Sequence, residues 1–516
     1  MINNIFFLKK EIEKIKILFS KKKFESVIKK TSNLLKKNPD QPMLYNFIGF
    51  SYLELGKYDM AINLWLSAIE KFPSEPSILC NIGITFKAKW NFSEARKYFR
   101  LALDKNPKHL QSYINLGNLE TSLNNNQLAL SYYLDAYKIN NNSEEVLTYL
   151  ALSYSANGDF IKAKKIINEL NMKFTNNTKS YQLYSKIHTY QNEDSHQKNM
   201  LEILKSKKLN DEDLANIYFA LAKSFFDQKN TKKFVEYTLK ANETKFKTFY
   251  KYNFDKELQQ FDKIKRYFKN FQFNETTNDK GENLIFILGL PRSGTTLMHQ
   301  IISSHSKVVG AEESDFLYQS LTNKFVDEND FKNFFASEVF DMAKISKLSD
   351  DILSKYRIYH ENKIIVDKNP FNFKWVGFIK ILFPKAKIIH SNRRVIDSAF
   401  SIYRNVFDSP LGWAYHQNYL VQYIKNYRDL MKFWDDQLGD YIYNYQYENL
   451  VHYQLEETKK VLNFCKLEFE ENCFDYTKNK IPVRTISVAQ VRQKIYKTSV
   501  KLSETFTEHF PFLKNI

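Results

Sequence analysis

A glycine-framed turn near position 290 brings hydroxyl groups and a guanidinium into a short stretch of chain. Gly289 and Gly294 have the G-x-x-x-x-G spacing of a nucleotide phosphate loop. The polar side chains within and directly after the turn are Arg292, Ser293, Thr295 and Thr296. Glycines let backbone N–H groups close around an anion, and a helix N-terminus behind them favours negative charge. The turn therefore predicts a site for a phosphate-like group.

The loop differs from a nucleotide triphosphatase loop at one position. Thr295 stands where the Walker motif has its lysine, and no clear acidic partner for magnesium follows. Hydrolysis of Mg·ATP depends on both groups. A nucleotide without a γ-phosphate and without a metal fits better, and 3′-phosphoadenosine 5′-phosphosulfate (PAPS) is such a nucleotide. A kinase-like P-loop transferase is the alternative.

Residues 291–298, Pro-Arg-Ser-Gly-Thr-Thr-Leu-Met, resemble the 5′-phosphosulfate loop of the sulfotransferases. The resemblance is to the tyrosylprotein-sulfotransferase type and its bacterial relatives with repeat domains, and it extends in patches over about 283–500. It implies transfer of a sulfuryl group from PAPS to a hydroxyl acceptor in a protein tyrosine, a carbohydrate or a lipid. Within the loop it implies that the residues from Arg292 to Thr296, including Gly294, hold the donor, and that Arg292 also takes part in catalysis.

Two segments resemble the catalytic positions of the family. Glu313 matches the second glutamate of a Glu-Glu-Thr/Ser step, which implies the general base, and Glu312 is the less favoured choice. A base is needed because a hydroxyl attacks poorly while it keeps its proton. Lys368, in Asp-Lys-Asn-Pro after an apolar run, matches a lysine that stabilises the transferring group and the leaving oxygen.

Histidine is the alternative base, since some small-molecule sulfotransferases use one. The candidates are His299, His305 and His390.

The resemblance also implies ligands for the 3′-phosphate of the donor. Arg393 follows the apolar pair at 388–389, and Ser401 lies eight residues later. The segment after Arg393 departs from the usual family pattern, so Arg394 stays open as the ligand. Ser487, in a Thr/Ser-rich Gln-Val segment, is implied to donate to the leaving oxygen, and Lys501 is a further candidate for contact with the nucleotide.

Short apolar runs must position these groups. They lie at 284–288, 364–366 and 388–389, with a weaker one at 441–443, and helical stretches separate them. This alternation predicts a parallel sheet with helices on both faces. We therefore expect an α/β, P-loop-like sulfotransferase domain over 283–510, after a polar linker at 273–283.

The N-terminal half repeats with a period of 34 residues. Gly49, Trp65 and Pro73 have counterparts 34 residues later at Gly83, Phe99 and Pro107, and the register continues into neighbouring units.

The pattern resembles the tetratricopeptide repeat and predicts an all-α solenoid over 5–175, with degenerate helical repeats or a cap over 176–272. Its aromatic residues are expected to be core, and its concave groove could hold a peptide or protein partner. An inactive, repeat-based interaction protein is thus the other alternative.

Composition fits a multidomain chain with packed cores. The 516 residues are 43% hydrophobic, with 12 glycines and 11 prolines. The net charge of +18 comes from lysines scattered through every segment, and we expect no nucleic-acid partner. Three cysteines without C-x-x-C spacing predict no disulfide or metal site. No run of eighteen apolar residues occurs, so we expect no transmembrane segment and a cytoplasmic location.

Overall fold

The computed structural model describes residues 2–206, 208–273, 279–325, 342–479, 481–495 and 497–516. They form two compact units, residues 1–150 and 151–516. None of the helices in these ranges is long and apolar enough to cross a membrane. Part of the predicted linker, 274–278, lies outside the described residues.

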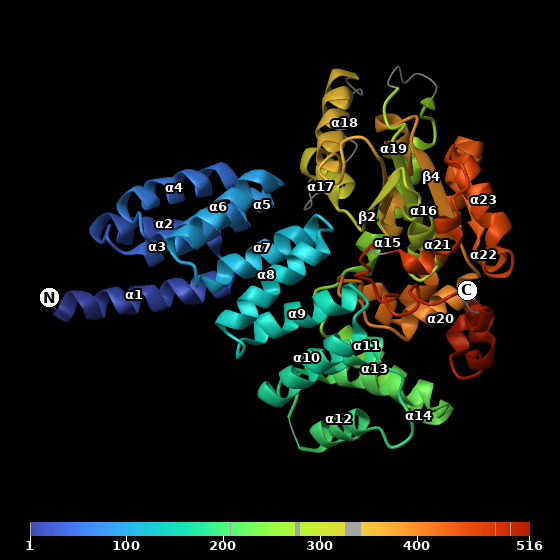
Figure 1. The fold of residues 1–516 in the computed structure, drawn as a ribbon, viewed down its shortest axis with the longest axis horizontal. Coiled ribbons are helices and arrows are strands. Elements are labelled where there is room, and N and C mark those ends of the chain that lie inside the picture. The colour runs from blue at the N-terminus through green and yellow to red at the C-terminus, as the bar shows by residue number, and fades with distance from the viewer. Residues whose placement is uncertain (1, 207, 274–278, 326–341, 480, 496) are drawn as a thin grey trace. The chain divides into compact units, whose positions relative to one another are not determined.

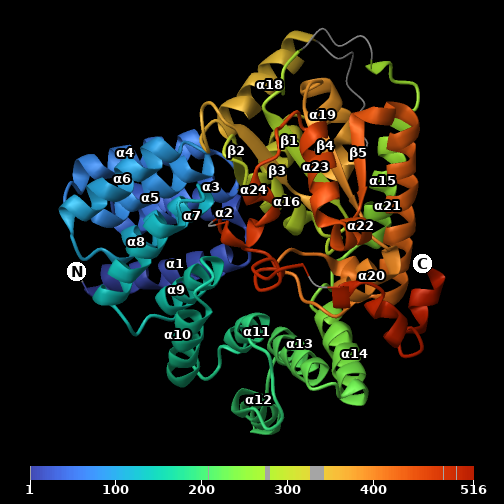
Figure 2. The ribbon, with the colours of Figure 1, turned by 45° about the vertical axis from the view of Figure 1, so that its right-hand side comes forward.

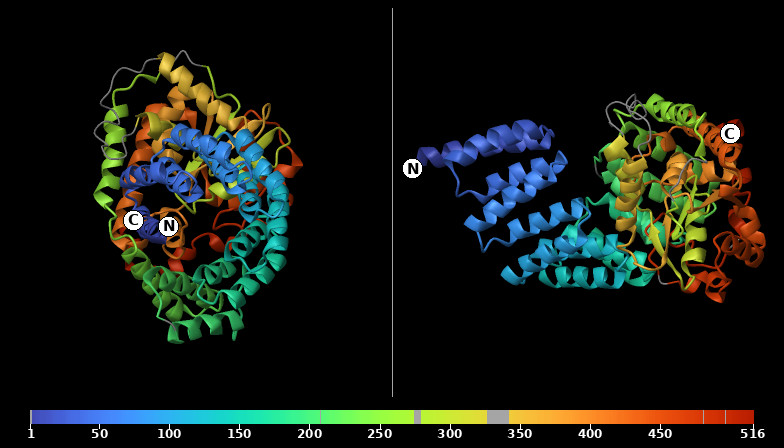
Figure 3. Two further views of the ribbon diagram at one scale, coloured as in Figure 1. Left: turned by 90° about the vertical axis from the view of Figure 1, so that its left-hand side faces the viewer. Right: turned by 90° about the horizontal axis from the view of Figure 1, so that it is seen from above.

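The first unit consists of helices that pack against their neighbours in sequence (Figures 1 and 3). They are α1 (Ile2–Ser20), α2 (Phe24–Lys37), α3 (Pro42–Glu54), α4 (Tyr58–Lys71), α5 (Pro76–Ala88), α6 (Phe92–Lys105), α7 (Leu110–Ser122), α8 (Asn126–Ile139) and the start of α9 (Glu144–Ala156). Helices α3, α5, α7 and α9 begin at 42, 76, 110 and 144, in steps of 34. The predicted repeat register is confirmed.

Glycine in these repeats is required by close packing. A Cβ atom at Gly83 would lie 2.6 Å from the Phe99 ring, and one at Gly49 would lie 2.4 Å from the Trp65 ring. Both rings are fully buried. The aromatic residues of the repeat are therefore core, as predicted, and each fills the space that the missing side chain leaves on the preceding helix.

The second unit begins with helices that continue from the repeats. They are α10 (Phe160–Lys173), α11 (Thr178–Ile187), α12 (Ser195–Ser206), α13 (Asp211–Asp227), α14 (Thr231–Lys247) and α15 (Phe254–Phe268). Phe234 of α14 packs edge-on against Phe506, and the side-chain amide of Asn242 donates to the Tyr403 carbonyl at 2.8 Å. These helices thus share a core with the sheet that follows, although the predicted boundaries at 175 and 272 stay predictions.

A five-stranded parallel sheet has the order β2-β3-β1-β4-β5. The strands are β1 (Leu284–Gly289), β2 (Val308–Glu312), β3 (Ile364–Lys368), β4 (Lys387–Asn392) and β5 (Ile442–Gln446). Four were predicted, and β2 was missed. Helices lie on both sides of the sheet (Figure 2). They include α16 (Thr295–Ser303), α17 (Phe316–Phe325), α18 (Met342–Tyr356), α19 (Val376–Leu382), α20 (Val395–Tyr403), α21 (Gln417–Leu438), α22 (Tyr447–His452), α23 (Gln454–Phe464) and α24 (Glu471–Phe474).

Strand β1 lies at the centre, where the chain changes direction across the sheet. Its neighbours are β3 on one side and β4 on the other, with Ile287 opposite Lys368 and Gly289 opposite Ser391. All carboxyl ends of a parallel sheet meet at one edge, and ligands bind in the crevice at such a reversal. The topology therefore brings the segments after β1, β2, β3 and β4 together.

Candidate active site

The turn after β1, which the sequence predicts to bind a phosphate-like group, contains three residues with positive φ angles. Gly289, Arg292 and Gly294 have positive φ angles of 150°, 69° and 103°. A Cβ atom at Gly294 would lie 2.4 Å from the Tyr447 ring, so only glycine fits. Ser391 of β4 donates to the Ser293 carbonyl at 2.8 Å and fixes the turn to the sheet. Helix α16 begins directly after it, with its first N–H groups available for an anion.

The guanidinium of Arg292 links the turn to two distant segments. Its Nε donates to Ser401 Oγ at 3.0 Å, and its Nη1 donates to Ser487 Oγ at 2.5 Å. Its Nη2 donates to Gln490 Oε1 at 2.7 Å. The structure thus brings together Arg292, Ser401 and Ser487 from the predicted site. Gln490 was missed, although it lies three residues after Ser487 and so one turn further on.

Arg393 faces the turn. Its Nη1 donates to the Arg292 carbonyl at 2.9 Å, and its guanidinium carbon lies 4.8 Å from the centre of the Tyr447 ring. Its Nη2 donates to the Ser499 carbonyl at 2.7 Å. Tyr447 lines the small cavity at the turn together with Arg393.

Arg394 and Lys501 are turned elsewhere. Arg394 Nη2 pairs with Glu504 at 2.8 Å. Lys501 has an exposed side chain, and its backbone N–H donates to Asp397 Oδ2 at 3.1 Å. Neither residue lines the cavities described below. The geometry favours Arg393 over Arg394, and the role of Lys501 stays a prediction.

Glu313 and Lys368 form an ion pair one strand away from the turn. Lys368 Nζ donates to Glu313 Oε1 at 2.5 Å. The lysine side chain is 1% exposed and the glutamate side chain 47%. A buried ammonium requires an oppositely charged partner. Here the partner is the Glu313 carboxylate, which is itself partly exposed to solvent. An acceptor can therefore reach the carboxylate while the lysine stays enclosed.

Glu312 is in a different environment. It is buried, its φ is +54°, and its carboxylate lies 3.7 Å from Arg484 Nε. Burial raises the pKa of Glu312 above its usual range. An enclosed carboxyl group is less accessible to an acceptor than Glu313.

Asp367, next to Lys368, is fully enclosed by polar partners. It accepts hydrogen bonds from Ser314 Oγ at 2.5 Å, from the Tyr356 hydroxyl, and from Asn372 Nδ2 at 3.3 Å. Burial raises the pKa of Asp367 to about 7. These contacts tie the end of β3 to the loop that carries Glu313.

The three histidines considered as bases are all buried. Burial lowers the pKa of His299 to about 3, and the Lys368 charge contributes in the same direction. His390 lies between Asn444 and Tyr427, and burial lowers its pKa. His305 Nε2 contacts the Glu468 carbonyl at 3.1 Å. Because all three histidines are buried while the Glu313 side chain is 47% exposed, the carboxylate is favoured as base.

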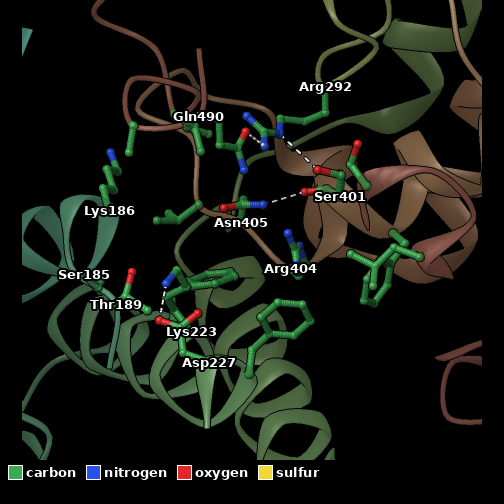
Figure 4. Close-up of a pocket in the computed structure, with 18 of the residues that line it drawn as sticks. Ser185, Lys186, Thr189, Lys223, Asp227, Arg292, Ser401, Arg404, Asn405 and Gln490 are labelled. Atoms are coloured by element: carbon green, nitrogen blue, oxygen red, sulfur yellow. Dashed lines mark hydrogen bonds and ion pairs between the residues drawn. The ribbon is translucent and has the colours of Figure 1, made fainter. Parts of the chain in front are cut away.

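Two cavities adjoin the phosphate loop. A small one, of about 70 Å³, lies against Thr295, Thr296 and Ser487. A larger one, of about 510 Å³, extends from Arg292 and Ser401 to helices α11 and α13 (Figure 4). Arg404 lines the larger cavity and was missed, although it lies three residues after Ser401 on the continuing helical turn.

The segment that carries Ser487 is anchored to the end of α9. Arg492 Nη2 donates to the Ala156 carbonyl at 2.5 Å, and the Val483 N–H donates to the same oxygen at 3.3 Å. A Cβ atom at Gly158 would lie 2.9 Å from the Arg492 side chain. The position of Ser487 thus depends on a helix some 330 residues earlier in the chain.

Within the described ranges, no group of three or more His, Cys, Asp or Glu side chains could hold a metal ion.

Comparison with known proteins covers both halves of the chain. A model of the sulfotransferase family matches residues 284–471, and a tetratricopeptide-repeat model matches residues 110–143. A protein of Aquifex aeolicus is 34% identical over 226 residues, which cover 42% of this chain and 30% of that relative. A Caenorhabditis briggsae protein assigned to the protein-tyrosine sulfotransferases is 30% identical over 195 residues, 37% of this chain and 68% of the relative.

Among solved structures, the sulfotransferase domain of the Synechococcus PCC 7002 olefin synthase is 19% identical, with a TM-score of 0.30. The alignment covers 46% of this chain and 98% of that domain.

Proposed function

Because the chain belongs to the sulfotransferase family, we propose that it transfers a sulfuryl group from PAPS to a hydroxyl group of an acceptor. The observation that carries the proposal is the convergence of Arg292, Ser401 and Ser487 at the carboxyl end of β1. The Glu313–Lys368 pair lies beside it, at the end of the neighbouring strand.

Each end of the donor has a set of polar groups to receive it. The backbone N–H groups of the turn and the hydroxyls of Thr295 and Thr296 would hold the 5′-phosphosulfate. Arg393 and Ser401 would hold the 3′-phosphate, since a guanidinium and a hydroxyl can both donate to one phosphate. Arg292 lies between the two sets.

Transfer requires removal of one proton and stabilisation of one leaving oxygen. The acceptor oxygen forms a bond to sulfur as the bond between sulfur and the 5′-phosphate oxygen breaks. Glu313 takes the hydroxyl proton, because its carboxylate is the accessible member of the ion pair. Lys368 and Ser487 donate to the oxygens on which negative charge develops. The products are the sulfated acceptor and adenosine 3′,5′-bisphosphate.

A third cavity, of about 540 Å³, is lined by sequence neighbours of the proposed base and its lysine, and it would receive the acceptor. Asp315, two residues after Glu313, and Asn369, directly after Lys368, both line it. Tyr318 and Trp375 form part of its wall, with their ring centres 6.0 Å apart. Aromatic walls suit a hydroxyl carried on a ring, in tyrosine or in a sugar. The assignment of the C. briggsae relative favours protein tyrosine. The repeats of residues 1–150 would recruit that protein.

Transfer of labelled sulfate from PAPS, with a chelator present, tests the proposal. Tyrosine-containing peptides, oligosaccharides and glycolipids are offered in parallel, and label is expected in one class. Binding is tested by thermal unfolding. Adenosine 3′,5′-bisphosphate without metal is expected to raise the melting temperature. A rise with Mg·ATP alone would support the kinase alternative, and no rise with either would support a protein that only binds partners.

A further inference from the structure

The large cavity beside Arg292 has walls from two parts of the second unit. One wall is the sheet side, where Arg292, Ser401 and Arg404 point into the space. The other wall comes from helices that continue from the repeats and carries Lys186 of α11 and Lys223 of α13 (Figure 4). All of the lining residues lie within residues 151–516. The cavity is therefore a feature of one compact unit.

Positive charge exceeds negative charge in this cavity. Its lining holds five cations, namely Lys186, Lys223, Arg292, Arg393 and Arg404, against the two carboxylates of Asp227 and Asp397. Asp397 is occupied by the Ser503 hydroxyl at 2.7 Å and by the backbone N–H of Lys501. Cations that converge on one enclosed space repel each other unless an anion lies between them. The lining thus suits a multiply charged anion.

Lys223 and Arg404 approach the cavity from opposite walls. The guanidinium carbon of Arg404 lies 4.3 Å from the centre of the Phe226 ring, which holds its charge against α13. Lys223 Nζ pairs with Asp227 and donates to the His188 carbonyl at 3.2 Å. Burial lowers the pKa of Lys223, and the charge of Arg404 lowers it further. Both side chains line the same cavity, so both can contact a ligand held there.

Lys186 adds a third charge from the end of α11. Its side chain is 16% exposed, and its carboxylate partner Asp408 lies 3.5 Å away. Burial lowers the pKa of Lys186. An ion pair of this length leaves the ammonium able to donate to a ligand in the cavity as well.

We propose that Lys186 and Lys223, across the cavity from Arg393 and Ser401, complete the binding site for the 3′-phosphate of the donor together with Arg404, which lies on the same wall as Ser401. The proposal rests on the proposed function, because it assumes a nucleotide with a 3′-phosphate. A volume of about 510 Å³ is typical of small-molecule sites. Helices α11 and α13 would then contribute side chains directly to donor binding.

The test uses the full chain with Lys186→Gln and Lys223→Gln. Calorimetry measures the affinity for adenosine 3′,5′-bisphosphate and for adenosine 5′-monophosphate, which lacks the 3′-phosphate. Loss of one charge-assisted contact is expected to weaken bisphosphate binding about 10-fold or more and to leave monophosphate binding unchanged. Lys186→Arg and Lys223→Arg keep the charge and are expected to keep the preference for the bisphosphate.

Lys179→Gln is the matched control. Lys179 lies on the same helix, pairs with the same Asp408 at 3.5 Å and does not line the cavity. Its replacement is expected to leave both affinities unchanged. Melting temperatures without nucleotide show whether each variant is folded.

The outcomes separate the two proposals. If the unaltered protein binds no bisphosphate, the proposed function fails. If it binds bisphosphate and both glutamine variants bind it equally well, the inference about the helices is overturned while the proposed function stands. Equal weakening toward both nucleotides would also overturn the contact with the 3′-phosphate.

Discussion

The helices of residues 24–139 and those of residues 160–247 continue one repeat pattern but contact different partners. In the first set, large rings such as Trp65 and Phe99 pack against glycines of the preceding helix within the same repeat. In the second set, Phe234 packs against Phe506 beside the sheet, and Lys223 faces a cavity. A repeat helix that contacts only other repeats needs apolar residues at fixed spacing. A repeat helix that packs against a different type of domain can contribute polar groups to the binding site of that domain.

The largest expected effect is a loss of turnover when a residue beside the sheet, Glu313, is replaced. Glu313→Gln removes the proposed base and is expected to lower turnover about 100-fold or more, because the acceptor proton then has no recipient. Affinity for adenosine 3′,5′-bisphosphate, measured by calorimetry, is expected to stay the same. Glu361→Gln, an exposed carboxylate before β3, is the control. Normal turnover by Glu313→Gln would show that another group is the base.

A smaller effect is expected from the regular repeats. Gly83→Ala places a methyl group 2.6 Å from the Phe99 ring, and such overpacking costs about 1–3 kcal/mol of unfolding free energy. Urea unfolding measures the loss, and sulfate transfer to a small acceptor should be unaffected. The double variant Gly83→Ala/Phe99→Leu frees space and should recover part of the stability. If the single variant is as stable as the original protein, the packing argument for the repeats is wrong.

A pH dependence of stability is expected at the end of β3. The pKa of Asp367 is about 7 in the folded protein, above its value of about 3.9 in an unfolded chain. Between these two pH values, Asp367 is protonated in the folded protein and ionised in the unfolded chain. The stability it provides is present below pH 4 and is lost as the pH rises toward 7.

Asp367→Asn should remove this slope, which is at most about 1.4 kcal/mol per pH unit. Urea unfolding at several pH values measures it, and Asp436→Asn on the exposed face of α21 is the control. Parallel curves for Asp367→Asn and the original protein would contradict the raised pKa.

Much of the fold could be predicted because periodicity is a local property. The steps of 34 residues and the apolar runs of β1, β3, β4 and β5 are visible in the sequence. Strand β2 was missed because Val308–Glu312 is short, contains Gly310 and ends in the glutamate pair, so its apolar part is only a few residues long.

The candidate site was predictable to the extent that each group lies in a motif. Arg292, Ser401 and Ser487 were named from their motifs, and the structure brings them into contact. Lys186 and Lys223 lie in helices without a recognisable motif, and only tertiary packing places them at the cavity.

The anchoring of Arg492 on the Ala156 carbonyl limits how this chain can be rearranged by recombination. The polar segment before β1 is an obvious place to divide the chain into two modules. Division there would separate the Ala156 carbonyl, at the end of α9, from Arg492, which donates a hydrogen bond to it. Grafting residues 283–516 onto another protein would leave Arg492 without this partner. Descendants of this architecture are therefore expected to inherit α9 and the C-terminal segment together.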